Sequence, residues 1–132
     1  MRNYSLKLDE YNIDRALYHE LRYRCLRYPQ MVAELEEIRG GVNAVQTPMP
    51  VEQHTAGDPT AKRAIKALKL ADNVREIERA AAEADPHLYP YILANVTQKA
   101  TFEDMKPPCG RRQFFEARRR FYYNLAYNTN FL

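Results

Sequence analysis

The stretch DPTAKRAIKALKLADNVREIERAAAEADP, residues 58–86, begins and ends with Asp-Pro. An aspartate accepts hydrogen bonds from the free N–H groups of a helix's first turn, and the following proline fills a position whose N–H has no partner in the helix. Apolar residues recur between the two Asp-Pro pairs every three or four positions, at Ile65, Leu68, Ala71, Val74, Ile77, Ala81 and Ala84. The pattern predicts one long helix, the longest of the chain, with a narrow apolar seam that packs against another helix.

The residues before this helix predict a shorter helical unit, over residues 1–39. Its apolar side chains fall mostly at intervals of three and four, at Ile13, Leu17, Leu21, Cys25, Tyr28, Val32, Leu35 and Ile38. Asn12 or Asp9 can cap its start, and Pro29 breaks or kinks it, because proline inside a helix removes a backbone hydrogen bond but suits a new first turn. We therefore expect a kinked helix or a helix pair that ends at Gly40-Gly41.

Two further segments complete the predicted organisation. Residues 40–57 carry glycines, prolines and no clear period, which is typical of a linker or an extended arm. Residues 58–132 form a helical domain, in which Asp85-Pro86 starts a second helix. That helix places on one face Leu88, Ile92 and Val96. Because no segment shows a convincing alternation with a period of two, the sequence predicts an all-α fold, a helical bundle of about five helices.

The carboxyl end, TFEDMKPPCGRRQFFEARRRFYYNLAY at residues 101–127, predicts a helix, a turn and a second helix. Thr101 resembles the first residue of a capping box and opens a helix of about one turn. Pro107-Pro108 ends that turn, and a last helix begins near Arg111. This helix-turn-helix-like unit has the order of elements that lets a second helix enter the major groove of DNA.

The last helix has two chemically different sides. A step of about 100° per residue places its apolar residues together, at Phe114, Ala117, Phe121, Tyr122 and Leu125. The opposite side carries a polar line formed by Arg112, Glu116, Arg119 and Tyr123, flanked by Gln113 and Arg120. This side suits DNA, because arginine and glutamine make bidentate hydrogen bonds to purine edges and arginine neutralises phosphates. It equally suits a solvated surface on which Glu116 pairs with nearby arginines.

The distribution of charge favours the carboxyl end as the place where a polyanion would bind. The formal net charge is only +3, but seven basic and three acidic side chains lie from Lys99 onward, whereas the preceding residues are close to neutral. No apolar run approaches the roughly 18 residues of a membrane span, and the amino terminus has no apolar signal region. We therefore expect no membrane partner and a cytoplasmic protein.

Residues that could carry catalysis or bind a metal are scattered. They lie on different segments, at Ser5, His19, His54 and His87. Cys25 and Cys109 are far apart and have no partner at ligand spacing, which indicates reduced thiols. The helix start beside Cys109 favours a thiolate, although packing in the turn is the alternative. We expect no enzyme, no cofactor and no metal site.

Most of the chain resembles phage transcriptional regulators of the ArpU and RinA type, whose carboxyl end is similar to the region-4 helix-turn-helix of sigma factors. The resemblance rests on the Asp-Pro-Thr start of the long helix, on the following LYPYIL, and on the stretch 101–127. The amino-terminal YHELRYRCLRYPQMVAELEEI is similar to the leading helix of such proteins. The resemblance implies a non-catalytic regulator of phage or prophage genes in a bacterial host, with double-stranded DNA and RNA polymerase as partners.

The resemblance also implies which side chains touch DNA. The polar start of the last helix matches the family's base-reading positions, and residues 118–120 match its basic run. Together with the polar line, the candidate DNA contacts are Arg111, Arg112, Gln113, Glu116, Arg119, Arg120 and Tyr123. The turn departs from the family, because Pro-Pro-Cys-Gly replaces the usual Gly-hydrophobic turn and the segment is shorter.

Two other classes of protein fit the same sequence. A small-terminase-like packaging subunit would also be basic, helical and DNA-binding, in a ring of many copies. An interaction module would use the alanine-rich helix 58–84 and the tyrosine-rich first helix to bind a partner or a second copy, because tyrosine is enriched at interfaces. The seam on the long helix can pack within one chain or form a homodimer, and the sequence leaves both open.

Overall fold

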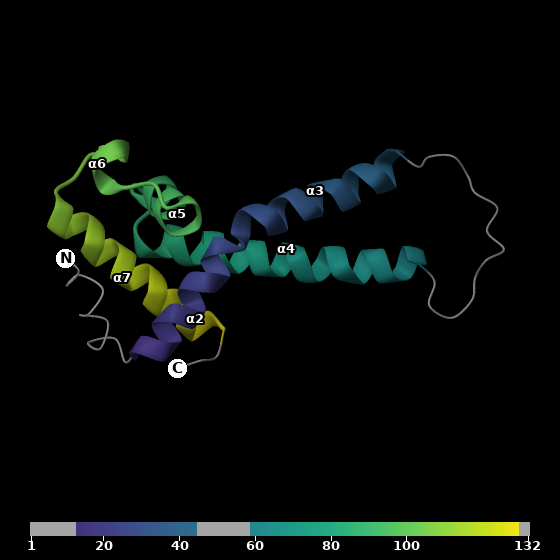
Figure 1. Cartoon of the computed structure of the whole chain (residues 1–132), viewed down its shortest axis with the longest axis horizontal. Coiled ribbons are helices and arrows are strands. Elements are labelled where there is room, and N and C mark those ends of the chain that lie inside the picture. The colour runs from purple at the N-terminus through teal and green to yellow at the C-terminus, as the bar shows by residue number, and fades with distance from the viewer. Residues whose placement is uncertain (1–12, 45–58, 130–132) are drawn as a thin grey trace.

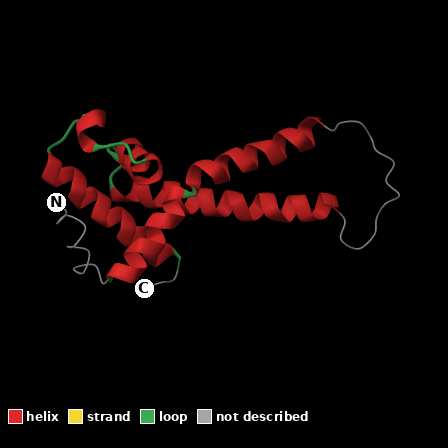
Figure 2. Cartoon of the chain, viewed as in Figure 1, coloured by secondary structure: helices red, strands yellow, loops and turns green. Residues whose placement is uncertain are grey.

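A computed structural model of the chain describes residues 13–44 and 59–129, and all regular structure in these ranges is helical (Figure 2). The described helices are α2 (Arg15–Leu26), α3 (Tyr28–Ala44), α4 (Pro59–Ala84), α5 (Tyr89–Gln98), α6 (Phe102–Met105) and α7 (Arg111–Asn128). The predicted all-α fold is therefore confirmed. The predicted caps Asp9, Asn12 and Asp58, and most of the predicted linker 40–57, lie outside the described residues.

The helices form a bundle with a projecting hairpin. Figure 1 shows α2, α5, α6 and α7 gathered around the carboxyl-terminal half of α4. In the same view α3 and the amino-terminal half of α4 run side by side, away from the other helices. An ion pair of 2.5 Å between Lys66 and Glu34 joins the two helices of this α3–α4 hairpin.

As predicted, α4 is the longest described helix, but its apolar seam is buried only in its second half. Val74, Ile77 and Ala81 belong to the core, because the bundle helices cover this part of α4. Ile65 and Leu68 are 53% and 66% exposed, so these two positions of the predicted seam do not pack within this chain. Because a spacing of three falls short of the 3.6 residues of a helical turn, the seam drifts around α4 and places Ile65 and Leu68 on the other side of the helix from Val74.

The amino-terminal helix pair forms as predicted, but it begins and ends differently. Asp14 caps α2 with its Oδ1 atom, which accepts a hydrogen bond from Leu17 N at 2.8 Å. The break falls at Arg27, so that Pro29 lies in the first turn of α3. The predicted stop at Gly40-Gly41 is wrong, since α3 continues to Ala44. Each glycine costs a helix about 1 kcal/mol relative to alanine, a weak preference that tertiary context routinely overrides.

The connection from α4 to α5 follows the predicted start signal. The Oδ1 atom of Asp85 accepts hydrogen bonds from His87 N at 2.9 Å and Leu88 N at 3.0 Å. Pro90 lies in the first turn of α5, where its missing N–H leaves no hydrogen bond unmade. A tight turn therefore folds α5 back onto α4.

α7 contributes the largest buried side chains of the core. The predicted apolar side is confirmed, because all of its members are buried, namely Phe114, Ala117, Phe121, Tyr122 and Leu125. They pack with Leu21 and Cys25 of α2, Ile77 of α4 and Ile92 of α5. Deleting a buried phenylalanine from such a core costs about 3–5 kcal/mol, so α7 is central to the stability of the bundle.

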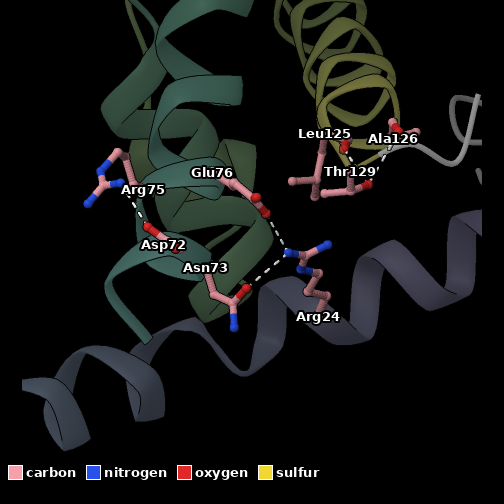
Figure 3. Close-up of polar contacts among 8 residues, drawn as sticks. All are labelled: Arg24, Asp72, Asn73, Arg75, Glu76, Leu125, Ala126 and Thr129. Carbon is pink, nitrogen blue, oxygen red and sulfur yellow. Dashed lines mark hydrogen bonds and ion pairs between the residues drawn. The ribbon is translucent and has the colours of Figure 1, made fainter. Parts of the chain in front are cut away.

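Polar side chains fix the helices at defined positions around this core. Arg24 of α2 reaches α4, where it pairs with Glu76 at 2.6 Å and donates to Asn73 at 3.3 Å (Figure 3). At the end of α7, Thr129 Oγ1 donates to Leu125 O at 2.8 Å, also drawn in Figure 3. Thr129 thus lies at one end of α7, and the first turn of the helix lies at the other end.

Candidate nucleic-acid interface

The start of α7 is positioned by α6 and the turn after it. Thr101 caps α6 as predicted, since its Oγ1 accepts a hydrogen bond from Asp104 N at 3.1 Å. Lys106 ends α6 in the left-handed region, with φ of 49°. Pro107 is buried and its carbonyl accepts a hydrogen bond from Cys109 N at 2.8 Å. Gly110 then precedes α7 and provides no side-chain cap, so the N–H groups of the first turn have no side-chain acceptor from it.

The first turn of α7 brings together three of the predicted contacts. Arg112 and Gln113 are exposed. Arg111 is also exposed, and its guanidinium lies over the ring of Phe102 at 5.2 Å and forms an ion pair with Glu103. Stacking on an aromatic ring restricts the conformations of an arginine without removing its charge. This turn is therefore a basic, ordered surface at one end of the last helix.

Two exposed lysines lie in the segment that leads from α5 to α7, and the sequence did not single them out as contacts. Lys99 ends α5 and Lys106 ends α6, both with positive φ, at 62° and 49°. Both side chains are exposed. We define the basic turn surface as Lys99, Lys106, Arg111, Arg112 and Gln113. Its acidic neighbours Glu103 and Asp104 are exposed too, so the surface is moderately basic.

The predicted solvent-facing position of Arg119 is wrong, because this residue is only 7% exposed. Its guanidinium forms an ion pair with the carboxylate of Glu116, three residues earlier. The ion pair agrees with the interpretation of this side of α7 as a solvated surface, but the burial of Arg119 does not. Beyond its first turn α7 packs against α2, α4 and α5, which leaves much less of its circumference to solvent than a helix with a single packed face.

The remaining predicted contacts are engaged inside the bundle. Arg120 Nε donates to the carbonyl of Ala84 at the end of α4, at 3.2 Å. Tyr123 is partly buried, with its ring edge-on to Tyr127 at 6.1 Å. These two side chains and the Glu116–Arg119 pair lie along α7 beyond the basic turn surface. The structure therefore groups Arg111, Arg112 and Gln113 and separates them from the other four candidates.

Arg118, which the resemblance placed in a basic run, also serves the packing of α7. Its Nη1 atom donates to Asn95 Oδ1 of α5 at 3.0 Å, and its guanidinium lies over the ring of Phe115 at 4.6 Å. Asn95 in turn donates from Nδ2 to the carbonyl of Ala100 at 2.8 Å. Arg118 thus holds α7 against the end of α5, from which Lys99 projects.

The two thiols have raised rather than lowered pKa values. Burial raises the pKa of Cys25 to about 12. Partial burial, together with the nearby Asp85 carboxylate, raises the pKa of Cys109 above its usual value of 9.0. The direction at Cys109 is opposite to the effect of a helix start alone, so desolvation in the turn outweighs it. Neither thiol has the low pKa that marks a nucleophile or a metal ligand.

The described residues form neither a metal-binding cluster nor a membrane-spanning helix. In the ranges 13–44 and 59–129, no group of three or more His, Cys, Asp and Glu side chains is placed to hold a metal ion. None of the helices described is both long and apolar enough to cross a bilayer. Comparisons with models of protein families, with curated proteins and with solved structures find no significant match to the chain.

Proposed function

We propose that the protein binds double-stranded DNA without catalysis, as a regulator of transcription of the phage or prophage type in a bacterial host. The observation that carries the proposal is the basic turn surface, where exposed cations and a glutamine meet at the start of α7. In DNA-binding helical proteins the amino-terminal residues of the recognition helix contact base edges. Arg112 and Gln113 occupy that position in α7.

The side chains of this surface can bind both the base edges and the phosphates of a DNA duplex. Arginine binds the O6 and N7 atoms of guanine, and glutamine the N6 and N7 atoms of adenine, each through two hydrogen bonds. Lys99 and Lys106, exposed at the ends of α5 and α6 in the segment that leads to α7, would neutralise phosphates. The positive end of the helix dipole and the N–H groups after Gly110 add to the attraction for a phosphate.

The geometry favours an end-on approach rather than a helix lying along the groove. α6 has only four residues, which is too short to cross the DNA backbone as the first helix of a full helix-turn-helix does. The middle of α7 is buried in the bundle, so its length is not free to lie in the groove. We therefore propose that only the first turn of α7 enters the groove, between flanking lysines. Regulation would additionally involve RNA polymerase, as the resemblance implies.

A salt-dependent titration with matched variants tests this proposal. Random-sequence duplex DNA is titrated by fluorescence anisotropy at about 50 and 200 mM salt, where phosphate contacts dominate. The variant Lys99→Ala/Lys106→Ala is compared with Arg15→Ala/Arg27→Ala, which removes the same charge from exposed positions at the two ends of α2. We expect the first variant to reduce the slope of log K against log salt by about 1.8, at about 0.9 per lost phosphate contact, and the control to leave it unchanged.

Two outcomes would contradict the proposal. Equal losses in the two variants would show that net charge alone drives binding. The absence of binding at the lower salt concentration would remove DNA as the partner of the basic turn surface.

A further inference from the structure

The first part of α4 exposes far more of its surface than the rest of the bundle. From residue 59 to residue 69, every side chain is exposed except Ala67, which is partly buried against the core cluster. Isolated helices of this length are marginally stable in water, and helices in proteins are stabilised by packing an apolar face. Here α3 supplies packing from one side only, as Figure 1 shows for the projecting hairpin.

An apolar face lies on the side of α4 that α3 does not cover. It consists of Ala61, Ala64, Ile65 and Leu68, which we call the α4 apolar face. Their spacing of i, i+3, i+4 and i+7 is the pattern by which a helix anchors itself on a partner surface. Leu70 and Val74, on the other side of the helix, are buried instead. Single exposed apolar residues are common, but four in one stripe on a projecting helix indicate an interaction site.

The charges beside this face are positive between residues 59 and 69, and the exposed Asp72, one turn beyond Leu68, is paired with Arg75 at 3.0 Å. Lys62 and Lys69 are exposed beside it, and no acidic residue occurs between residues 59 and 69. Lys66 is already paired with Glu34 of α3. Within the described part of the chain, neither Lys62 nor Lys69 forms an ion pair. An acidic surface that carries small side chains would complement both the lysines and the apolar stripe.

The opposite edge of the same hairpin is acidic and carries small side chains. One side of α3 faces the core and buries Met31, Leu35 and Ile38. About half a turn away lies the α3 acidic face, formed by Ala33, Glu36, Glu37 and Gly40, all exposed. A Cβ atom at Gly40 would meet nothing within 4 Å, so the packing of this chain gives no reason for a glycine there. Like the lysines, Glu36 and Glu37 have no ion pair within the residues described.

We propose that the α4 apolar face binds the α3 acidic face of a second copy of this chain. Ile65 and Leu68 would pack over Ala33 and Gly40 of the second copy, while the flanking lysines meet the two glutamates. Duplex DNA is the weaker candidate for this surface, because phosphates would satisfy the lysines and leave the apolar stripe in water. The inference does not rest on DNA binding by α7.

The proposed contact joins two different surfaces, and this has a consequence for the assembly. The two faces lie on opposite edges of one hairpin, so a copy that has used its α4 face still presents its α3 face. Such head-to-tail contacts do not stop at two copies; they close into a ring or continue as a filament. The mass of the assembly should therefore rise beyond that of a dimer as the protein concentration increases.

Sedimentation velocity of the full chain over a range of concentrations tests the inference. We expect self-association in the wild type and a monomer for Ile65→Glu/Leu68→Glu, whose exposed positions leave the fold intact by circular dichroism. The matched control is Tyr23→Glu/Tyr127→Glu, which changes two other exposed apolar side chains, 61% and 57% exposed, away from the hairpin faces. This control should associate like the wild type. A wild type that stays monomeric, or an unchanged assembly in Ile65→Glu/Leu68→Glu, would overturn the proposal.

Charge reversal identifies the partner surface. Lys62→Glu/Lys69→Glu and Glu36→Lys/Glu37→Lys should each be monomeric alone, because like charges then face each other. Mixed in equal amounts, the two variants should associate again, since every contact now pairs opposite charges. If Glu36→Lys/Glu37→Lys associates normally by itself, the α4 apolar face binds something other than the α3 acidic face, and the inference is wrong.

Discussion

The replacement of Arg119 by alanine separates the structure from the simplest interpretation of the sequence. A helical wheel places Arg119 on the polar side of α7, where its loss would weaken DNA binding and leave stability unchanged. In the structure Arg119 is 7% exposed and paired with Glu116, whereas Arg112 is exposed in the first turn. Arg119→Ala should therefore destabilise the fold, and Arg112→Ala should weaken DNA binding.

The size of the effect follows from how deeply the ion pair is buried. The Arg119 side chain is 9% exposed and that of Glu116 is 39% exposed, so one partner is desolvated and the other is still hydrated. Breaking a fully buried pair costs about 3–5 kcal/mol, and losing a surface pair costs about 0–1 kcal/mol. Between these limits we expect Arg119→Ala to lose about 2 kcal/mol. Arg112→Ala should change the free energy of unfolding by less than about 0.5 kcal/mol, as exposed substitutions do.

Urea and thermal unfolding followed by circular dichroism measure this difference, since the chain contains no tryptophan for a fluorescence assay. A loss of about 2 kcal/mol should lower the melting temperature of a chain of this size by about 8 °C. DNA affinity measured well below that temperature should be close to wild type for Arg119→Ala. The reasoning is refuted if Arg119→Ala melts with the wild type, or if it loses DNA affinity while its stability is unchanged.

Three further substitutions test other parts of the structure. Phe121→Ala should cost about 3–5 kcal/mol of unfolding free energy in urea, because Phe121 is fully buried, whereas Tyr127→Ala, at a side chain 57% exposed, should be nearly neutral. Thr101→Ala should cost about 1 kcal/mol by removing the cap of α6, and Thr101→Ser, which keeps the hydroxyl, should retain most of it. In the folded state the pKa of the Cys25 thiol is about 12, against 9.0 for an ordinary thiol. Between these two pH values only the unfolded state loses the proton, so the free energy of unfolding should fall as the pH rises. The fall should be about 1.4 kcal/mol per pH unit from this group, and an unfolding titration in which Cys25→Ala keeps the same slope would show that the thiol is not responsible.

The element boundaries were predictable where local chemistry sets them. Thr101 caps α6, Asp85 starts the turn into α5, and Pro29 accompanies a new helix, because each acts on backbone groups only a few residues away. The failure at Gly40-Gly41 has the opposite cause. Helix propensity disfavours glycine by only about 1 kcal/mol, and such a weak local preference is routinely overridden by tertiary context, which is not local in the sequence.

The candidate site was predictable only in part, for the same reason. Arg111, Arg112 and Gln113 are exposed together because they form a single turn. The exposure of Arg119 depends on how many helices surround α7, and that of Ile65 depends on which side of α4 is covered by α3. Neither is encoded in the spacing of residues within one helix. Lys99 and Lys106 end α5 and α6, and their place in the proposed site depends on how these helices pack against α7, which is a property of the tertiary fold.

The central claim is that the first turn of α7 and its flanking lysines contact DNA, and chemical-shift mapping by NMR tests it most directly. An isotope-labelled sample of this 15.5 kDa chain is titrated with random-sequence duplex DNA, and the amide shifts are followed residue by residue. We expect the largest changes at Lys99, Lys106 and residues 111–113. Changes confined to residues 59–69 of α4, or no changes at excess DNA, would contradict the account.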